Sequence, residues 1–268
     1  MIKVGIVGCG TIGSYLAKEI LKRYKDSVRL MGFCEVDGNK VAKLNRLLRI
    51  KLNVYSLEDL TEKCDLIIEA AVGEIAVQVV ESALKFNKDV MIMSVGGLLK
   101  EPQLFKKVKK SKIKLYIPSG AIAGLDALKA AGMSKIKSVS LTTKKPLAGL
   151  AGADYIKKNK IDLNKIKTEK VIFEGTAFDA VAGFPKNINV AAVLSLAGIG
   201  AKKTRICIIA SRQIKRNTHT IAIEGDFGKI ICCTENVPSK VNPKTSQLAV
   251  LSALAALDGI IDNIRIGN

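Results

Sequence analysis

Tryptophan is absent from the 268-residue sequence, and aromatic residues make up only 4% of it. The core must therefore be aliphatic. The longest apolar stretches, such as residues 190–201, fall short of the roughly 20 residues that a membrane span requires. The basic-then-apolar pattern of a signal peptide is also missing, because the chain starts directly with a predicted strand. We therefore expect a cytoplasmic protein with no membrane partner.

Cysteine pairs at metal-ligand spacing are lacking too. Four of the six cysteines stand alone in apolar runs, and the other two, Cys232 and Cys233, are adjacent, so no CxxC pair is present. We therefore expect small, buried, reduced cysteines and no metal site. Histidine is nearly absent as well, since the chain contains one, His219.

Acidic residues are too few to balance the basic ones. The 43 lysines and arginines against 24 aspartates and glutamates leave a formal net charge of +19, which can indicate nucleic-acid binding. The basic residues are spread through predicted helices, however, as in 106–110, without the interleaved aromatic residues that stack on bases. We expect a lysine-rich solvated surface that attracts an anionic substrate and cofactor, and no nucleic-acid partner.

Strands and helices alternate through residues 1–118. An apolar run at 3–7 leads into a glycine-rich loop at 8–13, a helical pattern follows, and a second apolar run at 28–34 ends at an acidic residue. The later predicted strands lie at 66–71, 90–94 and 113–117, and the later helices at 39–49, 74–86 and 101–110. This alternation predicts an α/β fold with a doubly wound parallel Rossmann sheet.

The glycine loop has the spacing GxGxxG between a strand and a helix. Gly8 would allow the tight turn, Gly10 would let the backbone approach a pyrophosphate, and Gly13 would let the helix lie close to the strand. Backbone amides at the start of that helix, around Thr11 and Ile12, would bind the phosphates. The loop therefore predicts an NAD or NADP site.

Glu35 follows the second strand, where a dinucleotide site has the acid that binds the adenosine ribose. A carboxylate there would repel the 2′-phosphate of NADP, so NAD is favoured, although Lys40 could weaken that preference. Asp37 is the alternative ribose acceptor. The alternative interpretation is that the same segment is an ordinary strand-turn-helix that binds no ligand.

The character of the sequence changes after residue 118. Two alternating strands, 219–224 and 229–234, flank a glycine-bounded turn that is typical of an antiparallel hairpin. We predict that residues 119–240 form a second α+β domain with a mostly antiparallel sheet, which would hold the substrate and the catalytic group.

The last segment, residues 241–268, is predicted to be a helix that returns to the first domain. Asn242 is placed to cap it and Pro243 to occupy its first position. His219 lies where a loop meets the second domain's sheet. Its position alone favours a satisfied or solvent-facing histidine, although histidine titrates closest to neutrality and suits proton transfer.

Four motifs carry a resemblance to a known family. They are 117–127 (IPSGAIAGLDA), 184–192 (FPKNINVAA), 216–219 (RNTH), and 235–239 followed by 242–246 (ENVPS and NPKTS). On these motifs the sequence resembles, nearly end to end, the L-aspartate dehydrogenases of archaea and some bacteria. The resemblance implies an enzyme that oxidises L-aspartate with NAD or NADP. The product iminosuccinate would hydrolyse to oxaloacetate and ammonia or feed NAD biosynthesis, and a homodimer is expected.

The resemblance also implies roles for individual residues. His219 would be the catalytic residue, and Ala121 or Ala123 would contact the nicotinamide end together with Asn189. Asn187 could hold the substrate, or it could simply cap the following helix.

One departure from the family leaves the partners of the substrate carboxylates unassigned. The family often has arginine where this sequence has Lys144 or Lys145. A lysine there would bind a carboxylate as a point charge, without the bidentate fork of arginine.

Three other functions fit the sequence less well. A related enzyme such as homoserine dehydrogenase or dihydrodipicolinate reductase is the first, although the latter should show a His-His pair. The second is an aldehyde dehydrogenase, whose nucleophilic cysteine would need a neighbouring base. The third is a non-catalytic NAD sensor or DNA-binding regulator, which would need a helix-turn-helix segment or a basic arm.

Overall fold

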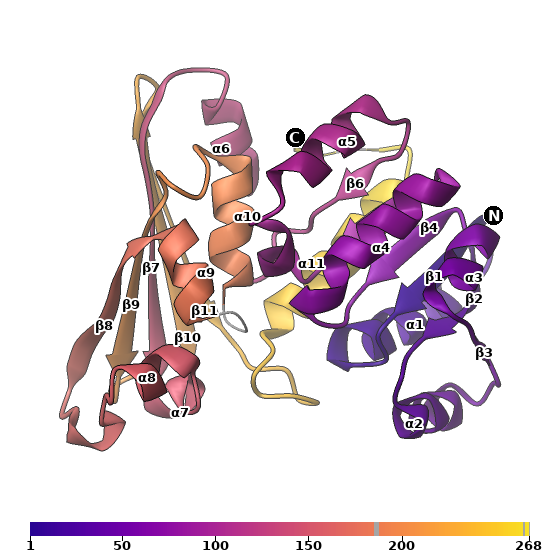
Figure 1. The fold of residues 1–268 in the computed structure, drawn as a ribbon, viewed down its shortest axis with the longest axis horizontal. Coiled ribbons are helices and arrows are strands. Elements are labelled where there is room, and N and C mark those ends of the chain that lie inside the picture. Colours follow the sequence, from indigo (N-terminus) through magenta and orange to yellow (C-terminus); the bar gives the residue numbers. More distant parts are fainter. Residues whose placement is uncertain (185–187, 265, 268) are drawn as a thin grey trace. The chain divides into compact units, whose positions relative to one another are not determined.

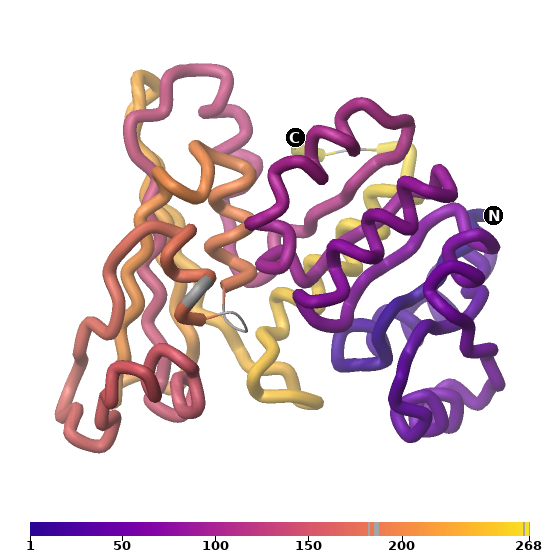
Figure 2. Tube along the Cα trace, in the orientation of Figure 1, coloured from indigo at the N-terminus to yellow at the C-terminus, as the bar shows by residue number. Residues whose placement is uncertain are grey.

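The computed structural model describes residues 1–184, 188–264, 266 and 267, and Figures 1 and 2 show its fold. Two compact units make up the chain. Unit 1 contains residues 1–118 together with 250–264, and unit 2 is built from residues 119–249. In the described ranges, no helix is both long enough and apolar enough to cross a membrane.

Unit 1 contains a six-stranded sheet in the order β3-β2-β1-β4-β5-β6, and every neighbouring pair is parallel. The strands are β1 (Ile2–Val7), β2 (Val28–Cys34), β3 (Asn53–Val54), β4 (Leu66–Glu69), β5 (Asp89–Ile92) and β6 (Leu115–Tyr116). The strand order reverses between β1 and β4, which is the point where doubly wound sheets bind ligands. The predicted Rossmann sheet is thus confirmed.

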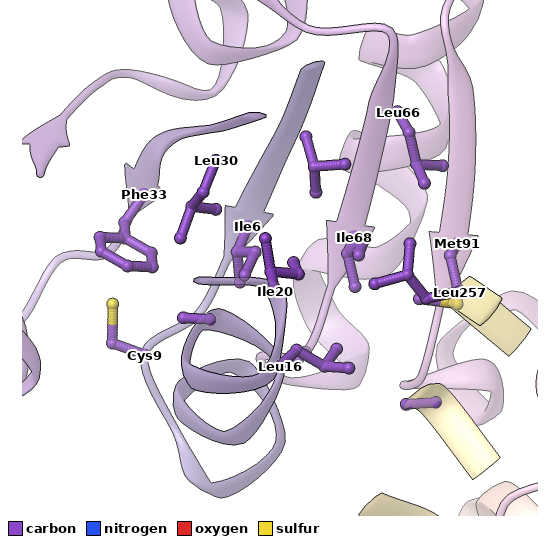
Figure 3. Close-up of a cluster of buried hydrophobic side chains, with 14 of the residues drawn as sticks. Ile6, Cys9, Leu16, Ile20, Leu30, Phe33, Leu66, Ile68, Met91 and Leu257 are labelled. Carbon is purple, nitrogen blue, oxygen red and sulfur yellow. The ribbon is translucent and has the colours of Figure 1, made fainter. Parts of the chain in front are cut away.

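Helices cover both faces of this sheet. They are α1 (Thr11–Arg23), α2 (Gly38–Leu48), α3 (Leu57–Lys63), α4 (Gly73–Phe86), the 3-10 turn η1 (Val95–Leu98), α5 (Pro102–Lys110) and most of α11 (Gln247–Ile261). Successive strand residues point to opposite faces, so Ile6 packs in the cluster with α1 and α11, whereas Val7 packs with α3 and α4. Figure 3 shows the first cluster, in which Leu16 and Leu257 approach the sheet.

The start of the C-terminal helix differs from the prediction. Asn242 and Pro243 were expected to begin it, but α11 begins at Gln247. The Asn242 side chain accepts a hydrogen bond from the Lys244 amide at 3.0 Å and forms a local turn. The hydroxyl of Ser246 instead accepts from the Leu248 amide at 3.2 Å, beside the first helical residue.

Unit 2 contains a five-stranded sheet in the order β11-β10-β7-β9-β8. The strands are β7 (Ile136–Pro146), β8 (Glu169–Thr176), β9 (Arg205–Ser211), β10 (Asn217–Gly225) and β11 (Gly228–Asn236). The pair β7 and β9 is parallel, and the other three pairs are antiparallel, including the hairpin of β10 and β11. The predicted α+β unit with a mostly antiparallel sheet is confirmed.

The helices of unit 2 are α6 (Leu125–Ala131), α7 (Leu147–Leu150), α8 (Asp154–Lys158), the 3-10 turn η2 (Leu163–Lys165), α9 (Ala177–Gly183) and α10 (Asn189–Ala197). Helices α6, α9 and α10 lie along one face of the sheet (Figure 1). On β10 the buried residues His219, Ile221 and Ile223 alternate with partly exposed ones. We call the side that they occupy the covered face of the sheet.

Candidate active site

The glycine loop follows β1 at the carboxyl edge of the unit 1 sheet. Gly8 has a φ of +98°, and a Cβ there would lie 2.7 Å from the carbonyl oxygen of Ala70, so only glycine fits. A Cβ at Gly13 would lie 2.0 Å from the carbonyl oxygen of Gly8, because helix α1 starts very close to the strand. Both glycines therefore stand where the sequence pattern requires them.

Gly10 differs from the other two glycines, because a Cβ at this position would meet only the Ala70 oxygen, at 3.8 Å. Gly10 is the N-cap of α1, where no side chain of the described residues caps the helix and no acidic residue lies in the first turn. The first amides of the helix, at Thr11 and Ile12, thus keep the positive end of the helix dipole available to a phosphate. The loop fits the phosphate end of a dinucleotide.

Glu35 lies directly after β2 and is bonded to the glycine loop. Its carboxylate accepts hydrogen bonds from the Cys9 amide at 2.9 Å and from the Asp37 amide at 3.0 Å, and Lys40 lies 3.9 Å away. Burial by itself raises the pKa of Glu35, but these amides and Lys40 outweigh it and bring the pKa below its usual value. The carboxylate is therefore ionised at neutral pH beside the loop, as a ribose acceptor must be.

The alternative ribose acceptor, Asp37, has a different task. Its side chain accepts from the Asn39 amide at 3.0 Å and forms the N-cap of α2. Glu35 is thus the carboxylate attached to the glycine loop, and Asp37 is a helix cap.

Sequence reasoning missed Glu69, a fully buried carboxylate at the end of β4. It accepts bonds from the amides of Ala71, Met93 and Ser94 at 2.7, 3.2 and 2.8 Å, and from the Ser94 hydroxyl at 2.8 Å. Burial raises its pKa, and the four donors oppose that rise. Glu69 thereby ties the ends of β4 and β5 together at the carboxyl edge. Its signal was a charged residue within the apolar run 66–71.

His219 is the third residue of β10 and is only 5% exposed, on the covered face of the unit 2 sheet. It stands opposite Thr143 of β7 and Thr234 of β11. The Thr143 hydroxyl lies 3.0 Å from the His219 Nδ1 atom and holds the ring in place. Burial, with a contribution from the positive charge of Lys145, lowers the pKa of His219 to about 4. The imidazole is therefore neutral at neutral pH, with its ring oriented by Thr143.

The segment 119–124 is fastened to the same strands. The Ala121 carbonyl accepts from the Thr234 hydroxyl at 2.9 Å and from the Asn236 side-chain amide at 3.1 Å. Thr234 also stands opposite His219, so the structure brings Ala121 and His219 together around one threonine. Ala123 is exposed, in contrast to the buried Ala121.

Asn189 is the first residue of α10 and is exposed. The N-cap of that helix is Ile188, so Asn189 does not occupy the capping position. Asn187, the predicted substrate contact, lies outside the described residues.

Lys144 and Lys145 point to opposite faces of β7, which separates their tasks. Lys144 pairs with Glu169 at 3.0 Å. Lys145 is only 6% exposed on the covered face, and burial lowers its pKa to about 8. Lys145 also lines a cavity of about 580 Å³ within unit 2. The candidate substrate cation is therefore Lys145, a choice that the sequence left open.

The cysteines do not form a chemical cluster. All six are free thiols, and the expectation that they are buried is wrong for Cys233, which is exposed on β11. Burial raises the pKa of Cys9 and Cys64 to about 12, so these thiols stay protonated. Across the part of the chain that the structure describes, no group of three or more His, Cys, Asp or Glu side chains could hold a metal ion.

Comparisons with known proteins identify the family of the chain. Residues 8–118 match the family "Homoserine dehydrogenase, NAD binding domain", and residues 126–260 match the family "Aspartate dehydrogenase, C-terminal". Among solved structures, aspartate dehydrogenase from Thermotoga maritima shares the fold, with a TM-score of 0.78 at 24% identity over the whole of both chains. A hyperthermophilic archaeal homoserine dehydrogenase in complex with NADPH has a TM-score of 0.60 at 12% identity, and the match covers 98% of this chain and 99% of that one.

Curated relatives extend over the full length. The L-aspartate dehydrogenase of Methanosarcina acetivorans is 44% identical over 271 residues, and that of Methanococcus maripaludis strain S2 is 39% identical, each match covering all of both chains. The family match over residues 126–260 separates this protein from enzymes that share only the dinucleotide-binding unit. The chain belongs to the L-aspartate dehydrogenase family.

Proposed function

We propose that this chain carries out the reaction for which its family is named, the oxidative deamination of L-aspartate with NAD or NADP. The product iminosuccinate hydrolyses to oxaloacetate and ammonia or enters NAD biosynthesis. The observation that carries the proposal is the position of His219, a neutral imidazole held by Thr143. Its strand partner Thr234 donates a hydrogen bond to the Ala121 carbonyl, so His219 lies next to the Ala121 segment. Such a base suits the removal of a proton from the water that attacks an imine carbon.

When bound, the cofactor would supply the hydride acceptor, its nicotinamide ring. The glycine loop and the start of α1 bind its phosphates, and Glu35 binds the adenosine ribose. Because the Ala121 carbonyl already accepts two hydrogen bonds, the exposed Ala123 is the better contact for the nicotinamide end. Asn189 offers a side-chain amide to the carboxamide.

His219 acts after the hydride has left. Loss of the hydride converts the neutral amine of L-aspartate into the protonated imine, C=NH2+, and His219 takes a proton from the water that attacks its carbon. His219 then gives this proton to the nitrogen of the carbinolamine. The C–N bond breaks, ammonia departs, and the remaining hydroxyl proton goes to His219 and from there to solvent, which leaves the ketone and the neutral histidine.

Replacing His219 tests this assignment. The variant His219→Asn should bind NADH as wild type does, because the glycine loop is unchanged, and should lose about 100-fold or more of its turnover. Because the chain has no tryptophan, the fluorescence of NADH measures its binding without a tryptophan background from the protein. The absorbance of the reduced cofactor measures turnover. Thr220→Val, the next residue on the opposite face of β10, is the matched control. Turnover of His219→Asn near the wild-type value would remove His219 from the mechanism.

The substrate is tested by comparing L-aspartate with L-homoserine, L-malate and L-glutamate in the same absorbance assay. L-Aspartate should give the highest kcat/KM with both NAD and NADP. Good activity with another of these acids and none with L-aspartate would reassign the substrate.

We also infer a cytoplasmic homodimer. In support, the uncovered face of the unit 2 sheet exposes apolar side chains, Val171 at 49% and Ile231 at 61%. Light scattering on the purified chain should give twice the monomer mass, and cell fractionation should recover the enzyme with the cytoplasm. A monomeric mass would refute the dimer.

A further inference from the structure

The two neighbours of β1 serve different halves of a dinucleotide. In the strand order of unit 1, β2 lies on one side of β1 and β4 lies on the other. Glu35, the proposed ribose acceptor, follows β2 and bonds the glycine loop. With the phosphates on the loop and the adenosine over β2, the nicotinamide half extends the other way. It then lies over the ends of β4 and β5, about 5 and 10 Å from the end of β1.

The buried carboxylate of Glu69 lies at these two strand ends. One of its oxygens accepts from the Ala71 amide and the Ser94 hydroxyl, and the other accepts from the amides of Met93 and Ser94. The carboxylate therefore joins the residues that follow β4 to those that follow β5. The glycine loop touches the same network, since a Cβ at Gly8 would lie 2.9 Å from the Ala71 Cα atom.

The donors around Glu69 fit its ionised form. The three backbone amides can only donate, and each carboxylate oxygen accepts at least one of them. Such amides stabilise a carboxylate over a carboxylic acid. Burial raises the pKa of Glu69, and the amides limit that rise. The arrangement thus holds a negative charge beneath the nicotinamide half.

In the described part of the chain, no cationic side chain balances this charge. None of the ion pairs found there includes Glu69. Its partners across the sheet, Val7 of β1 and Ile92 of β5, are apolar. A buried charge in such surroundings attracts a cation that enters the site above it. The oxidised nicotinamide ring carries a positive charge, whereas the reduced ring is neutral.

We propose that the buried charge of Glu69 makes the dinucleotide site bind the oxidised cofactor in preference to the reduced one. The inference rests on the cofactor part of the proposed function and does not depend on the substrate. Over about 10 Å, at an effective dielectric constant of about 20, one such charge changes the affinity for a cation by more than about tenfold. Because deamination consumes the oxidised cofactor, this preference helps the reduced product to leave the site.

The test compares two substitutions in the same hydrogen-bonded network. Glu69→Gln removes the negative charge and keeps the size of the side chain. Ser94→Ala, the matched control, removes one donor to the carboxylate and keeps its charge. The Kd values are measured on the full chain at pH 9, which favours the ionised carboxylate. The fluorescence of NADH reports its own binding, and displacement of NADH reports the binding of NAD and of ADP-ribose, which has no nicotinamide.

In Glu69→Gln the ratio of the Kd for NAD to the Kd for NADH should rise about tenfold, while the Kd for ADP-ribose changes in parallel with that for NADH. In Ser94→Ala the ratio should stay near the wild-type value. Equal weakening of NAD, NADH and ADP-ribose in Glu69→Gln would show that Glu69 only holds the strand ends, and would overturn the proposal. If Glu69→Gln does not fold, the wild type decides, because tighter binding of NADH than of NAD overturns the proposal.

L-Aspartate oxidation by the wild type separates this proposal from the proposed function, since the Kd values are measured without substrate. Normal oxidation together with an unchanged Kd ratio in Glu69→Gln would refute the role of Glu69 and keep the activity. A Kd ratio that depends on Glu69 in a chain that does not oxidise L-aspartate would refute the activity and keep the role of Glu69.

Discussion

Glu35 does two things at once, because its carboxylate bonds the Cys9 amide of the glycine loop and is also the proposed ribose acceptor. Its negative charge opposes a 2′-phosphate. Nearby Lys40 lies 3.9 Å from the same carboxylate and reduces that opposition. The preference between NAD and NADP therefore depends on the balance between these two side chains.

Replacing Glu35 should change cofactor preference. In Glu35→Ser the repulsion of the 2′-phosphate is lost, so we expect the ratio of kcat/KM for NADP to that for NAD to rise by about tenfold or more, with a lower value for NAD. Steady-state kinetics with both cofactors measure it. Asp37→Ser is the control, since serine can still cap α2 and the ratio should stay near wild type. An unchanged ratio in Glu35→Ser would place the ribose elsewhere.

Lys145 should reduce the stability of the empty protein. Its pKa is 10.5 in the unfolded chain and about 8 when folded. As the pH falls from 10.5 to 8, the unfolded chain takes up the proton and the folded chain does not, so the wild type loses stability. Below 8 both forms carry the proton and the loss is constant, on the order of 3 kcal/mol. Lys145→Met should therefore be more stable than wild type at pH 7.

Urea denaturation at pH 7, 9 and 10.5 measures this difference. The advantage of Lys145→Met should be largest at pH 7 and smallest at pH 10.5, while Lys144→Met should show no such trend. A Lys145→Met variant less stable than wild type at pH 7 would mean that the lysine serves the fold and not a ligand.

At the scale of elements, α11 is the least obvious part of unit 1, because it joins the core from the far end of the chain. Leu257 is fully buried and packs in one cluster with Ile68 and Met91 of the sheet (Figure 3). Leu251, on the same helix, is 42% exposed. The two leucines differ in burial but not in chemistry.

Leu257→Ala should lower the free energy of unfolding by about 2–5 kcal/mol, because it leaves a cavity in the core. Leu251→Ala is the matched control and should cost less than about 1 kcal/mol. Urea denaturation measures both free energies of unfolding, and the fluorescence of bound NADH reports whether unit 1 is folded. Equal effects of the two substitutions would show that α11 does not contribute to this core.

The elements of unit 1 could be predicted because each has a strong local signal. Its parallel strands are continuous apolar runs, and amphipathic helices separate them. Unit 2 gave less. Helices α6 and α9 have seven residues each, and α10 buries residues 191–195 in succession, so no polar face reveals its period. Only the hairpin and the apolar strands of unit 2 could be predicted from the sequence.

The candidate site divides in the same way. Gly8 and Gly13 belong to a local pattern whose mechanics the sequence shows. The choice between Lys144 and Lys145 depends on which face of β7 is covered, and the bond from Asn236 to Ala121 joins residues 115 positions apart. Such facts depend on the register of distant strands, which no local pattern contains.

At the scale of the whole molecule, the net charge of +19 should attract the anionic substrate. Raising the ionic strength from 0.01 M to 1 M shortens the Debye length from about 30 Å to about 3 Å. We expect the KM for L-aspartate to rise several-fold over this range while kcat changes little. Steady-state kinetics in sodium chloride test this, with potassium chloride as a second salt. A KM that is independent of salt would mean that the surface lysines only solvate the protein.

The return of α11 also sets an order of events during synthesis. Residues 1–118 of unit 1 are made before unit 2, but the core of unit 1 includes Ala253, Leu254 and Leu257, which are made after it. Nascent chains usually complete their N-terminal domain first. Here the cofactor-binding unit stays incomplete until α11 has been made, and by then every strand of unit 2 has left the ribosome tunnel or is inside it. The core beneath the glycine loop is thus completed only after the sheet of unit 2 has been made.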